Sequence, residues 1–293
     1  MNDQQVSFIG QLLADRYLVE RKLGQGGVGT AYRADDRRES RPVAVKIFNP
    51  GIEPGDPATE LLLADARTAA RLVSPNLMPT LDVGIHADRF AYVVEPLLAG
   101  RSLERRLEED GPLAPANAVR VAIELLAALE VLHRADLLHL DIKPSNVFLV
   151  ADPLGMERAV LSAVGTWHVL ALDEAPAKAT GTCLARPEYV TPEIVSGKPL
   201  DASSDVYLIG VLLYEMLTGR PPFPGTNQAT ARRHALEKPV SPKLVRPQAR
   251  ITDDLDALVD ARAPRRRRGA ASPPPPRSRG RWRRWRRPAS RRG

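Results

Sequence analysis

The sequence predicts an α+β protein of two lobes, a small β-rich lobe followed by a larger α-helical lobe. Short alternating segments around glycine-rich turns fill the first part of the chain, which is typical of antiparallel strands. Two long stretches with apolar residues at helical spacing, 116–138 and 203–219, fill the second part. A chain of 293 residues is long enough to bury a core in each lobe.

The expected organisation has four parts. A lead over residues 1–16 precedes the first lobe at 17–98, and the helical lobe is expected at 99–261. Residues 262–293 form a tail rich in Arg and Pro. Such a composition cannot bury enough apolar surface to offset the entropy of ordering, so the tail is predicted to be disordered.

Strands and one helix are predicted within the first lobe. The strands are expected at 17–24, 30–36, 41–48 and 91–98. A helix is expected at 55–75, because Asp56 can cap its first turn, Pro57 suits that turn, and Ser74-Pro75 ends the helical pattern.

Glycines lie between the first two strands. Gly24, Gly26 and Gly29 follow the pattern G-x-G-x-x-G, which by itself also fits an ordinary hairpin turn. In a dinucleotide-binding fold this pattern opens a helix, whereas here the strand TAYRA follows. A glycine loop between two strands lets backbone amides approach the phosphates of a nucleotide. Lys46, on a strand seventeen residues later, could reach the same phosphates, although a lone lysine on a strand usually faces solvent.

The segment HLDIKPSNV is the strongest chemical signal in the sequence. It brings three polar side chains into one short loop after a long helix. Asp141 can accept the proton of a hydroxyl, Lys143 can neutralise a transferring phosphate, and Asn146 can offer an oxygen to Mg²⁺.

The basic charge of the chain is concentrated in the tail. The whole chain has 42 Lys and Arg against 35 Asp and Glu, a net charge of +7. Residues 262–293 hold 14 of the Arg and no acid, so the remainder has 28 basic against 35 acidic residues, a net charge of −7. Besides disorder, two alternatives stay open for the tail. One is a contact with nucleic acid or an anionic membrane through Arg, Trp282 and Trp285, and the other is a shifted reading frame.

Composition also bears on the compartment. The sequence has no run of about 18 apolar residues that could span a membrane, and its N-terminus does not resemble a secretory signal. The single cysteine, Cys183, excludes a disulfide within the chain and fits a reducing environment. We therefore expect a cytoplasmic protein.

Five stretches together resemble the eukaryotic-like (Hanks-type) Ser/Thr protein kinases of bacteria. They are GQGGVGTAYRA, VAVKIF, HLDIKPSNVFLV, PEYVTPEIVSG and DASSDVYLIGVLLYEMLTGRPPF. The resemblance covers residues 17–261 and implies the bilobal protein-kinase fold, with a second lobe that stops short of its usual end. It also implies ATP as the bound nucleotide.

The resemblance implies roles for individual residues. Lys46 would bind the α- and β-phosphates of ATP, Asp141 would be the catalytic base, and Asn146 would hold a magnesium ion. Glu193 and Asp205 would anchor the second lobe, although the arginine that usually pairs with the glutamate is not found.

The main departure from the family falls at Ala163-Val164-Gly165, where the family has Asp-Phe-Gly and its aspartate binds Mg²⁺. A methyl group cannot coordinate Mg²⁺, which requires oxygen ligands. Asp173 lies ten residues later and is not followed by Phe-Gly, so it is not expected to substitute. Magnesium binding is therefore expected to be weak or absent, with Asn146 as the remaining ligand.

Three further departures are expected to matter. Asp65 aligns with the helix glutamate that pairs with Lys46, but its side chain is one methylene shorter. Leu140 replaces the arginine that receives a phosphorylated activation loop, so switching of that kind is expected to be absent. Arg186 stands where the family has a threonine whose hydroxyl links the catalytic Asp and Lys, and it would instead place a cation beside Asp141 and Lys143, where it could pair with Asp141.

Together these features favour a degenerate family member, a pseudokinase that binds ATP and has lost most or all phosphotransfer. The alternative is a weakly active kinase that transfers the γ-phosphate of ATP to protein Ser/Thr with Asp141, Lys143 and Asn146. The expected partners are the nucleotide and a protein, either a substrate or a regulated protein, which the sequence does not identify.

Overall fold

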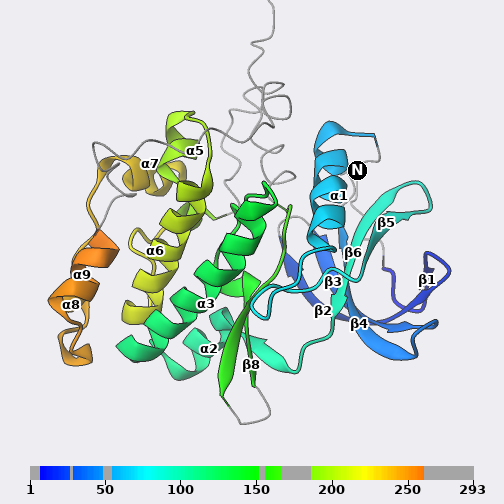
Figure 1. Cartoon of the computed structure of the whole chain (residues 1–293), viewed down its shortest axis with the longest axis horizontal. Coiled ribbons are helices and arrows are strands. Elements are labelled where there is room, and N and C mark those ends of the chain that lie inside the picture. Colours follow the sequence, from blue (N-terminus) through cyan, green and yellow to red (C-terminus); the bar gives the residue numbers. More distant parts are fainter. Residues whose placement is uncertain (1–6, 27–28, 49–54, 152–155, 167–185, 261–293) are drawn as a thin grey trace, which may run out of the picture.

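The computed structural model describes residues 7–26, 29–48, 55–151, 156–166 and 186–260. Within these ranges a β-rich first lobe lies beside a helical second lobe (Figure 1). The predicted α+β, two-lobed fold is confirmed. The tail, Asp173 and Cys183 lie outside the described residues.

A six-stranded antiparallel sheet forms the first lobe. Its strands are β1 (Leu12–Leu13), β2 (Tyr17–Gly26), β3 (Gly29–Asp36), β4 (Arg41–Phe48), β5 (Asp82–His86) and β6 (Phe90–Pro96). They lie in the order β1-β2-β3-β4-β6-β5. Alternate residues of β4 and β6, including Val43, Val45 and Val94, are buried on one face of the sheet.

Residues 8–16 belong to this lobe and do not form a separate lead. Phe8 and Leu13 are buried in the same core as Tyr17, and β1 pairs with β2. The apolar core of the first lobe therefore includes residues that precede the expected boundary at residue 17.

Helix α1 (Pro57–Ala69) covers the other face of the sheet. Leu62 and Leu63 pack against Phe48 and Val93 there. Asp56 caps the helix as predicted, since its side chain accepts a hydrogen bond of 3.3 Å from the backbone N–H of Ala58. The helix ends at Ala69, before the predicted stop at Ser74-Pro75.

The second lobe is built around two long helices, α3 (Pro115–Arg134) and α6 (Ala202–Thr218). Both were predicted, and they share one apolar core that includes Leu125, Leu129 and Leu212. The other described elements are α2 (Leu103–Asp110), α5 (Pro192–Ser196), α7 (Gln228–Leu236), α8 (Pro242–Val245), α9 (Asp253–Asp260) and the 3₁₀ turns η1 (Pro144–Asn146), η4 (Pro187–Tyr189) and η5 (Pro247–Ala249).

A small antiparallel sheet lies where the lobes meet. It consists of β7 (Gly100–Ser102), β8 (Val147–Ala151) and β9 (Glu157–Leu161), in that order. The backbone of Leu161 exchanges hydrogen bonds with Asn76 and Met78, at 2.8 and 2.7 Å, in the segment that follows α1. Because Val147 at the start of β8 pairs with Leu161 at the end of β9, the polar loop that precedes β8 lies beside Ala163, which follows β9.

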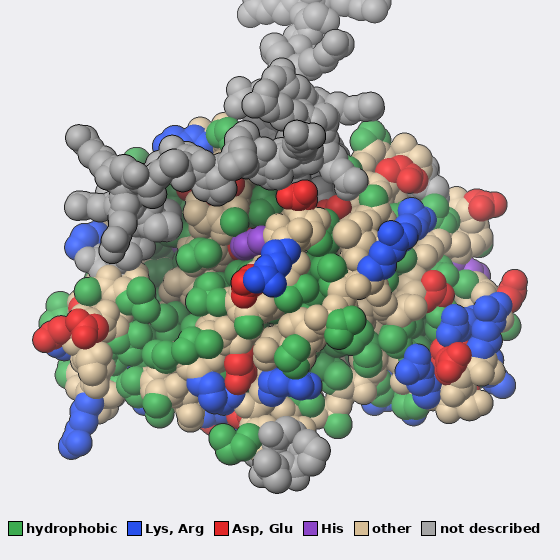
Figure 2. Space-filling view, in the orientation of Figure 1, with side chains coloured by type: hydrophobic (Ala, Val, Ile, Leu, Met, Phe, Trp, Pro, Cys, Tyr) green, Lys and Arg blue, Asp and Glu red, His purple; other side chains and the backbone are tan. Residues whose placement is uncertain are grey.

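Charged side chains of both signs are interspersed on the face that Figure 2 shows, and the described part of this face has no large patch of one sign. None of the helices in the described ranges has the length and apolar character needed to cross a membrane.

Candidate active site

Asp205 of α6 holds the backbone of the polar loop. Its carboxylate is fully buried, and Oδ2 accepts hydrogen bonds from the backbone N–H of His139 at 2.9 Å and from Nε2 of His133 at 2.8 Å. Oδ1 accepts a third bond, of 2.7 Å, from the backbone N–H of Leu140. Leu140 is buried and has φ of 55°, an uncommon conformation that this bond helps to hold.

His139 links the loop to the end of β9. Its ring is fully buried, with Nε2 2.8 Å from the backbone oxygen of Ser162. Its Nδ1 accepts a bond of 3.3 Å from the N–H of Asp141, so the proton of the neutral ring belongs on Nε2. Burial lowers the pKa of His139 and keeps it neutral, against the opposing charges of Asp205 and Asp141.

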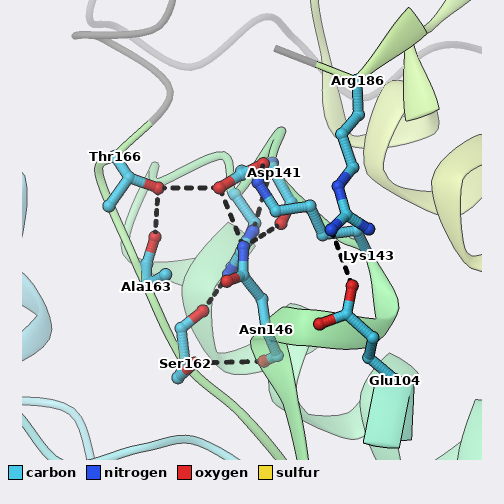
Figure 3. Close-up of polar contacts among 9 residues, drawn as sticks. Glu104, Asp141, Lys143, Asn146, Ser162, Ala163, Thr166 and Arg186 are labelled. Atoms are coloured by element: carbon cyan, nitrogen blue, oxygen red, sulfur yellow. Dashed lines mark hydrogen bonds and ion pairs between the residues drawn. The ribbon is translucent and has the colours of Figure 1, made fainter. Parts of the chain in front are cut away.

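The structure brings Asp141, Lys143 and Asn146 together, as the sequence predicts (Figure 3). Lys143 Nζ lies 2.5 Å from Oδ1 of Asp141, and Asn146 Nδ2 donates to Oδ2 at 2.8 Å. Thr166 adds a third donor, since its hydroxyl lies 3.1 Å from the same Oδ2. Burial by itself would raise the pKa of Asp141, but the charge and hydrogen bond of Lys143, together with Lys46, hold it below its usual value.

Ala163 lies beside this loop at the end of β9. The backbone N–H of Ser162 donates to the carbonyl of Asn146 at 2.9 Å, and the Thr166 hydroxyl donates to the carbonyl of Ala163 at 2.9 Å. Ala163 has φ of 70°, an uncommon conformation for a residue other than glycine. The side chain at this position is a methyl group, which offers no oxygen ligand.

Gly165 has two structural reasons to be glycine. Its φ is 81°, a left-handed conformation that glycine adopts without strain. A Cβ on Gly165 would lie 3.2 Å from Cβ of Asp65 and 3.3 Å from the carbonyl of Leu62. The segment after β9 therefore packs directly against α1.

These features agree with comparisons against known proteins. The family model described as "Protein kinase domain" matches residues 17–262. The chain belongs to the protein kinase family. Its relatives include bacterial Ser/Thr kinases, so the resemblance seen in the sequence is confirmed.

Three such relatives show the extent of the similarity. The chain is 30% identical over 257 residues to Serine/threonine-protein kinase pkn3 of Myxococcus xanthus, covering 86% of this chain and 47% of that protein. It is 35% identical over 235 residues to PknL of Mycobacterium tuberculosis, covering 78% and 56%. It is 33% identical over 255 residues to PknB of Mycolicibacterium smegmatis, covering 85% and 40%. The chain thus spans about half, or less, of the length of these curated relatives.

Solved structures agree on the fold. The kinase domain of Mycobacterium tuberculosis PknI aligns with a TM-score of 0.67 and 21% identity, over 87% of this chain and 91% of that one. A single-residue mutant of the same domain aligns with a TM-score of 0.66. At this identity the match shows the kinase fold alone.

Within this kinase domain, Lys46 projects from β4 and is partly buried. Burial lowers its pKa, while the charges of Asp141 and Glu95 raise it. Its Nζ lies 5.5 Å from the ring centroid of Phe48. The charge of Asp65 is not among those that act on Lys46, and Asp65 is instead buried on α1, where it packs against Gly165. The structure therefore does not bring the expected pair together.

The three glycines of the β2–β3 hairpin differ in their surroundings. A Cβ on Gly29 would lie 2.4 Å from the backbone oxygen of Ile47, so this glycine is required for the packing of β3 on β4. A Cβ on Gly24 would meet no atom within 4 Å, and one on Gly26 would only reach the oxygen of Gly29 at 4.0 Å. Gly24 and Gly26 thus leave space for a ligand to approach the backbone.

The expected pairing of Arg186 with Asp141 is wrong. The guanidinium of Arg186 lies 2.6 Å from the carboxylate of Glu104 at the start of α2 (Figure 3). The hydroxyl that donates a hydrogen bond to Asp141 belongs to Thr166, a residue that the sequence analysis did not single out. Thr166 follows Ala163 by three residues, and its role depends on a turn that brings its hydroxyl back to the Ala163 carbonyl.

The second expected anchor, Glu193, is partly buried in α5. Its carboxylate accepts a hydrogen bond of 3.3 Å from the hydroxyl of Ser204, at the start of α6. A neutral donor from the neighbouring helix therefore contacts the carboxylate of Glu193.

Proposed function

We propose that this protein kinase domain binds ATP but has lost phosphotransfer or retains little of it. The observation that carries the proposal is Ala163, whose methyl group occupies the position where the family resemblance places a magnesium-binding aspartate. Removing one preorganised electrostatic partner from an active site typically lowers the rate by about 100- to 1,000-fold.

The described residues fit a magnesium ion poorly. Among them there is no group of three or more His, Cys, Asp or Glu side chains that could hold a metal. The amide nitrogen of Asn146 donates to both the backbone and the side chain of Asp141, which leaves only its amide oxygen for a cation.

The residues fit the phosphates of a nucleotide better. Lys46 supplies a partly buried positive charge, and the backbone at Gly24 and Gly26 is open to approach. Asp65 was expected to pair with Lys46. Because it packs against Gly165, it would affect the lysine only indirectly, by fixing the position of α1.

Asp141 is a weak base in this arrangement. Lys143, Asn146 and Thr166 all donate to its carboxylate, and hydrogen bonds to the charged form stabilise that form. A carboxylate with a lowered pKa takes a proton from an acceptor hydroxyl less readily. The same convergence of Asp141, Lys143 and Asn146 favours the second candidate function, a slow Ser/Thr kinase that retains the loop for transfer.

Restoring the missing carboxylate tests both candidates. In Ala163→Asp the new side chain enters a left-handed position that Asp tolerates better than most residues. We expect wild type to bind ATP with or without Mg²⁺ and to transfer little phosphate to a generic basic protein. The variant should gain Mg²⁺-dependent binding and about 100-fold more transfer.

Ala116→Asp is the matched control, because it adds the same charge at an exposed site in the first turn of α3. If wild type already transferred phosphate with a strict Mg²⁺ requirement, the slow-kinase candidate would be correct. If wild type bound no ATP under either condition, both candidates would fail.

A further inference from the structure

Lys46 and Glu95 lie on the same face of the first-lobe sheet. Strands β4 and β6 are antiparallel neighbours in which Lys46 pairs with Val93 and Ala44 pairs with Glu95. Residues two apart on a strand share a face, so the lysine and the glutamate are diagonal neighbours. Such neighbours are about 7–8 Å apart, within reach of two long side chains.

This face is the one that α1 covers. Val93 pairs with Lys46 and lies two residues before Glu95 on β6, and it is buried with Phe48 against Leu62 of α1. The charged side chains of Lys46 and Glu95 are both partly buried. Two opposite charges removed from water at this distance are more stable together than apart.

The segment after β9 also acts on the charge of Glu95. Burial raises the pKa of its carboxyl group, while the charge of Lys46 and a hydrogen bond from the backbone N–H of Ala163 lower it. The other charges that act on Lys46 come from the polar loop, namely Asp141, which favours its protonated form, and Lys143, which opposes it. On the facing helix, Asp65 packs against Gly165.

We propose that Glu95 is the counter-ion that positions Lys46, in place of an acid from α1. The proposal deepens the proposed function, because Lys46 is the residue assigned to the nucleotide phosphates. A pair within one sheet has its distance set by strand register. The orientation of Lys46 would then not depend on the position of α1, and movement of that helix would not switch the site on or off.

The test measures the protonation of Lys46 without any nucleotide. Acetic anhydride labels only the neutral amine, so labelling of Lys46 across a pH series, read by mass spectrometry of the full chain, reports its charge. Glu95→Gln should increase labelling at pH 8 by about tenfold for each unit by which the lysine pKa falls. Asp65→Asn and the exposed Glu60→Gln should leave the pH midpoint unchanged.

An unchanged midpoint in Glu95→Gln, or an equal shift in Asp65→Asn, would overturn the proposal. If Glu95→Gln does not fold, the stability of the single variant Lys46→Met is compared with that of the double variant Lys46→Met/Glu95→Met. The second substitution should then restore stability, because it removes a carboxylate buried without its counter-ion, and a further loss would contradict the pairing. Since labelling needs no ATP, failure of nucleotide binding in wild type would be seen separately.

Discussion

Replacing Asp205 by alanine should destabilise the protein strongly, because this carboxylate is the acceptor for two buried backbone donors. The N–H groups of His139 and Leu140 lie 2.9 and 2.7 Å from its oxygens, and His133 lies 2.8 Å away. Each buried donor left without a partner costs about 1–3 kcal/mol. The two buried backbone donors alone therefore predict a loss of about 2–6 kcal/mol in the free energy of unfolding.

Urea unfolding followed by circular dichroism measures this loss. Asp201→Ala is the matched control, since Asp201 caps the same helix and loss of such a cap costs about 1 kcal/mol. Asp205→Asn retains one acceptor oxygen and should fall between the two. A loss below about 1 kcal/mol in Asp205→Ala would show that water or a relaxed loop satisfies the donors, and the anchoring role would be refuted.

Three other outcomes are expected. ATP binding should change little when Mg²⁺ is chelated, because Ala163 offers no ligand oxygen; complete loss of binding in a thermal-shift titration would contradict this. Lys46→Ala should weaken ATP binding far more than Asp141→Ala, because only the lysine would touch phosphate in the ground state, and equal losses by calorimetry would argue against the assigned roles. Burial and the charge of Glu188 raise the pKa of Glu215 to about 7. The stability that its protonated carboxyl group contributes is therefore fully present below the unfolded-state pKa of 4.5 and is lost as the pH rises through 7. Glu215→Gln should therefore raise the free energy of unfolding by up to about 3 kcal/mol at pH 8 and by little at pH 5; equal effects at both pH values would exclude this cause.

Local patterns in the sequence were sufficient for the main elements. The apolar spacing of α3 and α6, the cap at Asp56 and the glycine hairpin each act over a few neighbouring residues, so they can be read without knowledge of the fold. The loop that holds Asp141, Lys143 and Asn146 was found for the same reason, since all three side chains lie within six consecutive residues.

Contacts between distant segments were decided by the tertiary structure alone. Arg186 was expected on Asp141 but lies on Glu104, eighty-two residues away in the chain. Thr166 reaches Asp141 only because a turn follows β9. In each case a side chain has several partners within its reach, and the packing of other elements determines which of them it meets.

The charges around Lys46 illustrate the same division. The sequence by itself determined that a lysine would stand on an apolar strand after a glycine loop, and that the segment after β9 would carry Ala163 in place of a carboxylate. The family resemblance suggested Asp65 as the partner, because Asp65 aligns with the helix glutamate that pairs with this lysine in the family. The register of β4 and β6 sets Glu95 diagonally across from the lysine, and strand pairing over such a separation depends on the assembled sheet and not on any local pattern.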